Sequence, residues 1–406
     1  MKVLYFHQHF STPRGATAIR SYEMAKHLIA RGHQVTMVCG SYQGGETELT
    51  APFLGGLRRG KVDGIDVIEF NLAYSNHDGF IKRAMTMVKF GVRSVGLALT
   101  ESYDLVFATS TPLTSGIPGI FARWMRGKRF VFEVRDLWPE LPREMGVIKN
   151  PLILGMLSGL EWLSYRSAHR IIGLSPGMVE GIARRGISKK HIEMVPNGCD
   201  LGIFGQGLDA WRPMGVAETD LMAIFTGTHG IANGLEAVLD AAVELKARGR
   251  DDIKLVLVGQ GMLKPGLQKR VEKEGLSNVI FHDAVNKSRL AGLMASADLG
   301  MQILANVPAF YFGTSPNKFF DYIAAGLPVL NNYPGWLAQL IDEHFCGFAV
   351  PPADPVAFAD ALERAANDRE SLKKMGENSR RLAGGEFHRA KLADRFVGFL
   401  ETSAAR

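Results

Sequence analysis

The chain opens with VLYF at residues 3–6, TAIRSYEMAKHLIARG at 17–32 and QVTMVCG at 34–40. The two short runs are apolar and rich in β-branched residues, as buried strands are, and the longer run has the spacing of an amphipathic helix. Strand, helix and strand in this order build parallel sheets with helices on both faces. The opening of the chain therefore predicts a doubly wound α/β fold.

This alternation continues to about residue 200, is lost between Leu201 and Asp220, and restarts with LMAIFTG at 221–227. We therefore predict two Rossmann-like domains, residues 1–205 and 206–385, followed by a helix at 386–406 that closes the second domain or crosses back to the first. Two such domains in tandem place the carboxyl ends of two parallel sheets across a cleft, where ligands bind in open α/β folds.

The bulk composition is that of a soluble globular protein, with 46% hydrophobic and 22% charged residues in 406. Three isolated cysteines, an N-terminus without the apolar region of a signal peptide and the absence of a long uncharged apolar run predict a cytoplasmic location without a zinc site. The net charge of +6 indicates an anionic partner. Basic residues interleaved with aromatic ones are lacking, so we predict no nucleic acid partner.

The stretch TSPNKFFDYIAAGLPVL, residues 314–330, predicts a helix from Ser315 to about Ala325 that runs into a buried strand. The unpaired N–H groups of its first turn, at Ser315 and Asn317, and the cation of Lys318 favour a phosphate. Asp321 follows one turn further in. An ordinary capped helix with a surface lysine is the alternative.

Two glycine turns precede other predicted helices. HFSTPRGATAIR contains Arg14 and Gly15, and FTGTHGIANG contains His229 and Asn233, which could donate to an anion. Neither turn is a G-x-G-x-x-G motif or a P-loop, and either one is also compatible with a plain loop. The ends of the next strands, VGQG and FHDAV, with His282, Asp283 and Val285, could line a planar base.

EVRDLWPE, residues 133–140, places Glu133, Arg135 and Asp136 at the carboxyl end of an apolar strand, where α/β enzymes carry their chemistry. Charged groups are seldom buried without partners. They form a structural ion-pair cluster or act on a substrate, and we favour the second reading.

FIKRAMTMVKFGVRSVGLAL, residues 80–99, reads as a basic amphipathic helix. Its apolar stripe suits an anionic membrane surface or, equally, packing on the sheet. The stripe contains Ile81, Met85, Val88, Val92, Val95 and Leu99, and the basic residues beside it are Lys82, Arg83, Lys89 and Arg93.

The two Rossmann-like halves, the glycine turn at Gly15, EVRDLWPE, the THG turn and PNKFFDYIAAGLPV together resemble the retaining GT-B glycosyltransferases of the family 4 type. The resemblance covers nearly the whole chain. It is closest to the bacterial enzymes that build O-antigen, capsule or exopolysaccharide units, including N-acetyl-fucosamine transferases.

The resemblance implies transfer of a sugar from a UDP-sugar to a lipid-linked acceptor, on the inner face of the cytoplasmic membrane. It places Thr314, Ser315, Asn317 and Lys318 at the pyrophosphate, Asp321 at the ribose, and residues 282–285 at the uracil. Gly15 would let the first domain close over the phosphates. Asp136, assisted by Arg135 and Glu133, would orient the acceptor or steady the sugar.

Departures from the family pattern are also visible. Gly313 stands where the first of two glutamates is usual, and His229 and Asn233 replace the usual Arg and Lys. No D-x-D motif is present, so we expect no metal cofactor. A UDP-sugar 2-epimerase on the same scaffold and a non-catalytic nucleotide-sugar-binding peripheral membrane protein remain alternatives.

Overall fold

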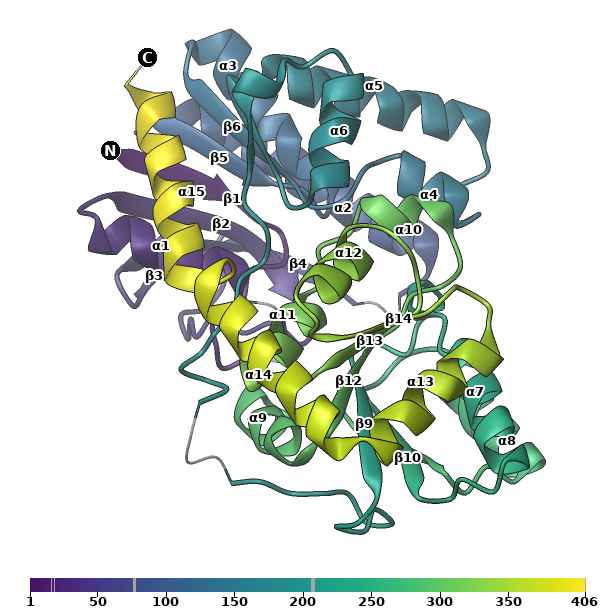
Figure 1. Cartoon of the computed structure of the whole chain (residues 1–406). Coiled ribbons are helices and arrows are strands. Elements are labelled where there is room, and N and C mark those ends of the chain that lie inside the picture. Colours follow the sequence, from purple (N-terminus) through teal and green to yellow (C-terminus); the bar gives the residue numbers. More distant parts are fainter. Residues whose placement is uncertain (16, 18, 76–77, 206–208, 406) are drawn as a thin grey trace. The chain divides into compact units, whose positions relative to one another are not determined.

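The computed structural model describes the chain except residues 16, 18, 76–77, 206–208 and 406 (Figure 1). It contains two compact units. Unit 1 comprises Met1–Pro196, Gly313–Ser315 and Ala390–Arg406, and unit 2 comprises Asn197–Phe312 and Pro316–Arg389. Each unit is built around one sheet.

Unit 1 has an eight-stranded sheet in the order β3-β4-β2-β1-β5-β6-β7-β8, parallel except for the β3–β4 pair. Its central strands are apolar and buried on both faces, as the opening sequence predicts. The elements are β1 (Lys2–Phe6), α1 (Arg20–Ala30), β2 (Gln34–Tyr42), β3 (Leu57–Val62), β4 (Ile65–Tyr74), α2 (Phe80–Thr100), β5 (Leu105–Thr109), η1 (Leu113–Gly116), α3 (Ile117–Arg126), β6 (Arg129–Val134), α4 (Glu140–Glu144), α5 (Pro151–Ser167), β7 (Arg170–Gly173), α6 (Pro176–Arg184), η2 (Lys189–His191), β8 (Ile192–Met194) and α15 (Arg389–Ala404).

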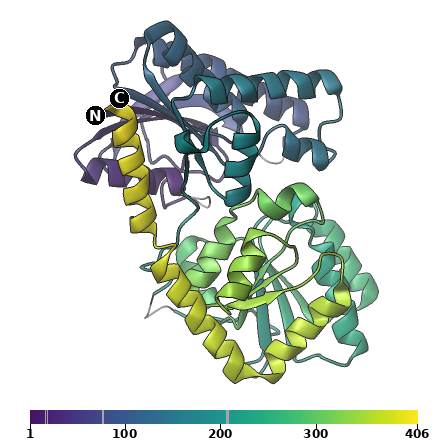
Figure 2. The ribbon, with the colours of Figure 1, turned by 45° about the horizontal axis from the view of Figure 1, so that its top comes forward.

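The period-2 alternation of β1 divides its side chains between the two faces of this sheet. Leu4 and Phe6 join the core under α2, α3 and α5. Tyr5 points to the other face, where its ring meets Phe107 of β5, and Phe107 in turn lies 5.0 Å from Phe396 of α15. The final helix therefore packs on unit 1, although the residues just before it belong to unit 2 (Figures 1 and 2).

The β3–β4 hairpin is not among the strands that the alternation predicts. Asp63 and Gly64 form its turn with φ of 49° and 87°. Asp-Gly between two alternating runs is the sequence signal of a tight hairpin, so the hairpin was readable from KVDGIDVIEF.

Unit 2 has a six-stranded parallel sheet in the order β11-β10-β9-β12-β13-β14 (Figure 1). Unit 2 thus has the second Rossmann-like sheet that the restart of the alternation predicts. Its elements are β9 (Leu221–Thr226), η3 (Ile231–Asn233), α7 (Glu236–Ala247), β10 (Ile253–Val258), α8 (Lys264–Glu274), β11 (Val279–His282), α9 (Lys287–Ser296), β12 (Leu299–Gln302), α10 (Pro308–Phe312), α11 (Asn317–Ala325), β13 (Val329–Asn331), α12 (Trp336–Glu343), β14 (Gly347–Ala349), α13 (Pro355–Asn367) and α14 (Arg369–Gly385).

The chain enters unit 2 earlier than the loose stretch around residues 201–220 predicts. The division falls between Pro196 and Asn197, because the residues that follow bind the last residues of unit 2 in the sequence. The Cys199 backbone N–H donates to the Phe387 carbonyl at 2.7 Å, and Asp200 forms an ion pair with Arg389. The predicted boundary at 205/206 thus lies inside unit 2.

Candidate functional site

Helix α11 of unit 2 is fixed at the carboxyl edge of its sheet. A side chain at Gly300 of β12 would collide with the Tyr322 ring, with contacts of 2.4–2.8 Å, so the glycine lets the helix lie directly on the strand. The Tyr322 hydroxyl accepts a hydrogen bond of 2.9 Å from the Thr226 backbone N–H at the end of β9. These contacts hold the start of α11 beside the β9 turn.

The helix begins at Asn317, two residues later than predicted, because Pro316 is extended (ψ 131°) and acts as the N-cap. No side chain caps this end. The Phe319 backbone N–H donates to the Pro316 carbonyl at 3.3 Å, whereas the N–H groups of Asn317 and Lys318 precede any acceptor of the helix. The helix dipole makes this end positive. Of the predicted phosphate residues, Thr314 and Ser315 belong to unit 1, whereas Asn317 and Lys318 open the helix in unit 2.

Lys318 and Asn233 come together, as their predicted shared role requires. The Lys318 ammonium donates to Asn233 Oδ1 at 2.6 Å and lies 4.0 Å from the centre of the Phe225 ring. Asn233 is itself fixed, because its Nδ2 donates to the Thr228 carbonyl at 2.7 Å. Burial lowers the pKa of Lys318 to about 7, because it disfavours the charged form, and a neighbouring anion would shift the side chain back toward the charged form.

Asp321 is buried and paired with a lysine that sequence reasoning missed. Both carboxylate oxygens accept hydrogen bonds of 2.8 Å from Lys287 Nζ. Burial raises the pKa of Asp321, and Lys287 opposes that rise. Lys287 opens α9, far from PNKFFDYIAAG in the sequence, so no local pattern indicates it.

His229 does not replace the cation that is usual after the first strand of this domain. Its side chain is fully buried, and burial together with Lys264 and Lys318 lowers its pKa to about 4. Its backbone N–H donates to the Gln260 carbonyl at 2.9 Å. A neutral imidazole cannot offset diphosphate charge, but its one ring N–H can still donate a hydrogen bond, and neither ring nitrogen has a partner within the described part of the chain. The prediction that His229 donates to an anion therefore stays a prediction.

The ends of β10 and β11 form a wall beside this turn. Side chains at Gly259 and Gly261 would strike the backbone of Gly227 and His229, so glycine is required for the loops to meet. Lys264 joins the strand ends, donating to the Gly259 carbonyl at 2.9 Å and to Asp283 at 2.7 Å.

Of the residues predicted at a planar base, His282 packs against Trp211 with ring centres 5.1 Å apart, Asp283 is exposed and Val285 is half-buried. His282 ends β11, and Asp283 and Val285 lie in the loop that follows it.

In unit 1, a second polar cluster lies at the carboxyl ends of β1, β5 and β6. Asp136 accepts a hydrogen bond of 3.0 Å from the Thr111 hydroxyl, and burial raises its pKa. The Arg135 backbone N–H donates to Ser110 Oγ at 2.8 Å, and its guanidinium lies 3.5 Å from His7 Nε2. The predicted Arg135 and Asp136 therefore share one edge with His7.

Residues after β1 belong to this cluster, although sequence reasoning passed over them. Gln8 is fully buried, and neither atom of its side-chain amide has a hydrogen-bond partner within the described part of the chain. The same holds for His7 Nδ1 and His9 Nε2. Burial lowers the pKa of both histidines, that of His9 to about 3. Neutral, unpaired donors and acceptors of this kind suit the hydroxyl groups of a ligand.

Glu133 does not belong to a substrate site. It is fully buried, accepts hydrogen bonds of 3.2 and 2.8 Å from the Arg20 guanidinium, and accepts one of 2.7 Å from the Thr109 hydroxyl. Burial alone would raise the pKa of Glu133, but Arg20 outweighs it and holds the pKa below its ordinary value. Arg20 also donates to the carbonyls of Val195 and Pro196, where the chain leaves unit 1. The structural alternative for this charge is therefore the correct one.

Glu133→Gln should destabilise the protein by about 3–5 kcal/mol, because it leaves the buried Arg20 without its counter-charge. Urea unfolding at pH 7 measures the loss. Because the pKa of Glu133 is depressed in the folded state, its contribution is present above the unfolded-state pKa and disappears as the pH falls through the folded-state value. The double variant Arg20→Met/Glu133→Gln should recover part of the stability. Equal stability of Glu133→Gln and the unmodified protein would contradict this structural role.

The loop before α1 differs from its predicted use. A side chain at Gly15 would strike Ser11 Oγ at 2.2 Å and the Glu46 backbone. This glycine therefore lets its loop pack closely against the segment that contains Glu46. Arg14 is exposed and forms an ion pair of 3.0 Å with Glu48.

Helix α2 leaves most of its apolar stripe in solvent and packs through another side. Phe90, Gly91, Ser94, Leu97 and Ala98 are buried. In contrast, Ile81, Met85, Val88 and Val92 are exposed. Val95 and Leu99, the last two residues of the stripe, are half-buried. The alternative that the stripe packs on the sheet is therefore wrong for residues 81–92 only.

The predicted basic flank of α2 is only partly free. Lys89 is exposed, and Lys82 forms an ion pair of 2.7 Å with Asp78. Arg83 donates to the Tyr74 hydroxyl at 3.0 Å, and Arg93 lies over the Phe70 ring at 5.2 Å. Arg83 is thus committed to its own unit.

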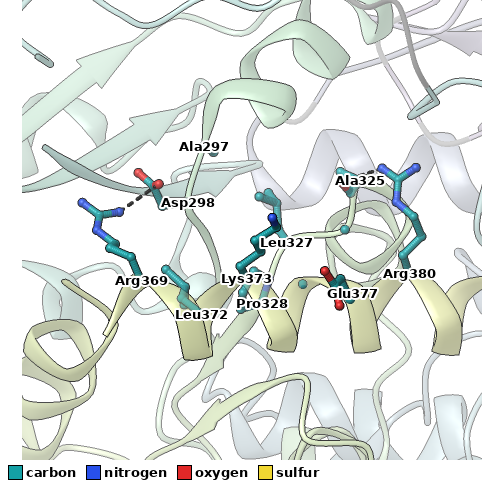
Figure 3. Close-up of a pocket in the computed structure, with 12 residues that line it drawn as sticks. Ala297, Asp298, Ala325, Leu327, Pro328, Arg369, Leu372, Lys373, Glu377 and Arg380 are labelled. Atoms are coloured by element: carbon teal, nitrogen blue, oxygen red, sulfur yellow. Dashed lines mark hydrogen bonds and ion pairs between the residues drawn. The ribbon is translucent and has the colours of Figure 1, made fainter. Parts of the chain in front are cut away.

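Two pockets lie within single units. One of about 490 Å³ in unit 1 is lined by residues that include Tyr42, Tyr74 and Lys82, beside the start of α2. The other, of about 360 Å³ in unit 2, is shown in Figure 3. It lies before the amino ends of β12 and β13, at the edge opposite the start of α11, and its Arg369 is paired with Asp298 at 2.9 Å. The pocket in Figure 3 is therefore not the candidate site.

The described residues also bear on metal binding and on membrane crossing. No group of three or more His, Cys, Asp or Glu side chains among them is arranged to hold a metal ion. None of the helices they form is long and apolar enough to cross a bilayer.

Two protein families match the chain, one on each half. Residues 15–198 match the family described as "Glycosyl transferase 4-like domain", and residues 211–382 match "Glycosyl transferases group 1".

Curated relatives are distant in sequence. An uncharacterized glycosyltransferase of Methanocaldococcus jannaschii is 22% identical over 365 residues, 87% of this chain and 86% of that protein. O-antigen chain mannosyltransferase C of Escherichia coli is 23% identical over 262 residues, 63% of this chain and 67% of that protein. MMP alpha-(1->4)-mannosyltransferase of Mycolicibacterium hassiacum is 26% identical over 224 residues, which are 54% of this chain and 50% of that protein.

Solved structures share the fold of the whole chain. Sucrose-phosphate synthase of Thermosynechococcus elongatus superposes with a TM-score of 0.78 at 18% identity, covering 100% of this chain and 99% of that one. HepE of Anabaena in complex with UDP and glucose gives a TM-score of 0.69 at 17% identity, covering 99% and 100%. The two Rossmann-like sheets are therefore those of the GT-B fold.

The family matches decide between the alternatives that the sequence left open, because both halves match transferase domains and the relatives are transferases. An epimerase or a non-catalytic nucleotide-sugar-binding protein is not needed to explain the fold. The chain belongs to the glycosyltransferases, with a glycosyl transferase 4-like domain followed by a glycosyl transferases group 1 domain.

Proposed function

We propose that the protein transfers a sugar from a UDP-sugar to a polyprenyl-diphosphate-linked glycan, with retention of the anomeric configuration and without a metal ion. The sugar is an N-acetylated amino sugar or a deoxy sugar, and the product is a unit of a cell-surface polysaccharide. The relative that builds the O-antigen chain and the UDP complex of HepE support the class of product and the donor nucleotide.

The observation that carries this proposal is the start of α11. It combines an uncapped helix N-terminus with a lysine held in place by Asn233 and with an acid one turn further along. The N–H groups and Lys318 would hold the pyrophosphate, and Asp321 would hold the ribose hydroxyls in exchange for part of its contact with Lys287.

The main chemical demand is the negative charge that collects on UDP as the glycosidic bond breaks. Donors fixed before the reaction stabilise that charge without reorganisation. The first turn of α11 and Lys318 meet this demand, so the charge relief that a metal ion supplies in other enzymes comes here from the protein.

The acceptor side is assigned to the polar edge of unit 1. Asp136 would orient or deprotonate the acceptor hydroxyl or steady the positive sugar. The neutral His7 and Gln8 offer hydrogen bonds to hydroxyls. The pocket beside Tyr42 and Tyr74 is large enough for a further sugar. Its aromatic rings and polar side chains suit a carbohydrate, because ligand sites combine apolar surface with a few polar groups.

A lipid-linked acceptor requires the enzyme to reach the inner face of the cytoplasmic membrane. The exposed stripe of α2, with Met85 and Val92 beside the basic Lys89, supports docking there as a peripheral protein.

The nucleotide is tested by thermal unfolding with UDP, ADP and GDP at equal concentrations. UDP at 100 times its Kd should stabilise the protein by about 2.7 kcal/mol, and the other two should have less effect. Transfer is then measured with radiolabelled UDP-N-acetylhexosamines and membrane lipid extracts, with NMR of the new linkage reporting its configuration. Preference for another nucleotide would contradict the proposal of a UDP-sugar donor. Inversion of the anomeric configuration would contradict the proposed retaining mechanism.

A further inference from the structure

Large apolar side chains are exposed together on α2, α3 and α5 of unit 1. Ile81 of α2, Trp124 of α3 and Leu152 of α5 are 74%, 65% and 73% exposed. Other exposed residues of these helices are Phe80, Met85, Val88 and Val92 of α2, Phe121 and Met125 of α3, and Ile153, Met156, Trp162 and Leu163 of α5.

These side chains belong to one surface, which we call the three-helix face. The helix α3 contacts both α2 and α5, and Trp124 Nε1 donates to Ser167 Oγ of α5 at 2.8 Å. The inner sides of the three helices enter the same core, through Phe90, Ala122 and Tyr165. Because the helices form one layer on the sheet, their outward sides form one continuous surface.

The charge of the three-helix face has a single sign. Its three helices contain one acid, Glu161, which is buried and paired with Arg185. Lys89 is exposed, and Arg123 and Arg166 lie against the indole rings of Trp124 and Trp162 at 5.5 and 6.0 Å. The basic residues of these helices are Lys82, Arg83, Lys89, Arg93, Arg123, Arg126 and Arg166.

Of these cations, Lys82 is paired with Asp78, which lies just before α2. Exposed tryptophans, aliphatic side chains and helices whose one acid is buried match the boundary of an anionic bilayer, where indole rings lie among the headgroups. A second copy of this chain is a poorer occupant, since a symmetric contact would place basic residues opposite basic residues. A continuous exposed apolar surface that extends over three helices usually marks a site that binds a partner or a membrane.

We propose that the three-helix face binds the surface of an anionic lipid bilayer, with α3 and α5 contacting lipid as well as α2. The inference rests on the proposed function, because contact with the bilayer would bring the enzyme to its lipid-linked acceptor. It differs from docking through α2 alone in the width of the surface and in assigning lipid contacts to Trp124, Leu152 and Met156.

The test is flotation of the full-length protein with vesicles of phosphatidylcholine alone or mixed 1:1 with phosphatidylglycerol. Binding should need phosphatidylglycerol. The variant Trp124→Ser/Met125→Ser and the variant Leu152→Ser/Met156→Ser should each lower the partition coefficient at least tenfold. Lys89→Glu should lower it further, since one basic residue near an anionic surface is worth about a fivefold change.

The matched control is Met214→Ser/Met262→Ser, which removes two exposed methionines of unit 2 and should leave vesicle binding unchanged. All variants alter exposed side chains, and circular dichroism with thermal unfolding confirms that they fold. Fluorescence of Trp124 and Trp162 should be quenched by brominated phosphatidylcholine, and Trp124→Phe should remove part of the quenching.

Three outcomes would overturn the inference. Vesicle binding unaffected by the α3 and α5 variants would restrict the contact to α2. Dimers in analytical ultracentrifugation that these variants dissociate would make the face an interface between copies. Equal binding to both vesicle types would show that the face does not require an anionic bilayer. UDP binding, measured on the same variants, is independent of all three, so a failure here is distinguishable from a failure of the proposed sugar transfer.

Discussion

Lys318→Met should lower kcat/KM for transfer by about 10²–10³-fold, the loss that follows removal of one fixed donor to a developing negative charge. Methionine keeps the length of the side chain and its contact with Phe225 but removes the ammonium that Asn233 holds at 2.6 Å. The β9 turn, residues 227–234, is fully described and contains no Lys or Arg, and His229 is neutral there. Steady-state transfer assays and calorimetry with UDP measure the loss.

The pH dependence gives Lys318 a signature that a structural role would not produce. With a pKa of about 7 in the free protein, the side chain is charged below pH 7, and UDP affinity should be constant there. A bound diphosphate favours the charged form and raises the pKa, so above pH 7 binding must take up a proton and affinity should fall, by up to about tenfold per pH unit. Lys318→Arg should retain affinity and lose this slope.

The matched control is Lys269→Met on the exposed side of α8, which should change neither quantity. Unchanged UDP affinity in Lys318→Met, or a pH slope that survives Lys318→Arg, would remove Lys318 from the diphosphate site and with it the main support for the proposed function.

Asp136→Asn should abolish measurable transfer while UDP affinity stays within about twofold. The side chain lies at the edge of unit 1 and accepts a hydrogen bond from Thr111, so an amide of the same shape keeps the packing. What it loses is the negative charge that would orient or deprotonate the acceptor hydroxyl, and general-base contributions are about 10²–10⁴-fold.

Burial raises the pKa of Asp136, so the ionised form is lost at a higher pH than for an ordinary carboxyl group. Activity of the unmodified enzyme should therefore fall as the pH is lowered through this raised value. Glu144→Gln on the exposed side of α4 serves as the control. Turnover of Asp136→Asn equal to that of the unmodified enzyme would exclude the residue from the mechanism.

The sequence by itself determined the architecture, because strand and helix periodicity are local properties. Apolar runs such as VLYF and LMAIFT became central strands, and PNKFFDYIAA became a helix that ends at Gly326 in the left-handed conformation. The sequence also placed Lys318 and Asn233 at the carboxyl edge of the same parallel sheet, and the structure shows that they form a hydrogen bond with each other.

Only the tertiary structure decided which charged residues are available for chemistry. Glu133 and Asp136 are three positions apart in one octapeptide, yet Glu133 faces Arg20 from α1 inside the core while Asp136 lies at the sheet edge. His229 loses its charge through burial among rings from other strands, and Asp321 gains Lys287 from α9. The helix α2 showed the same limit, since its apolar stripe was readable but the face it buries was not. A pKa and a counter-ion depend on distances between residues remote in sequence, and local patterns do not contain those distances.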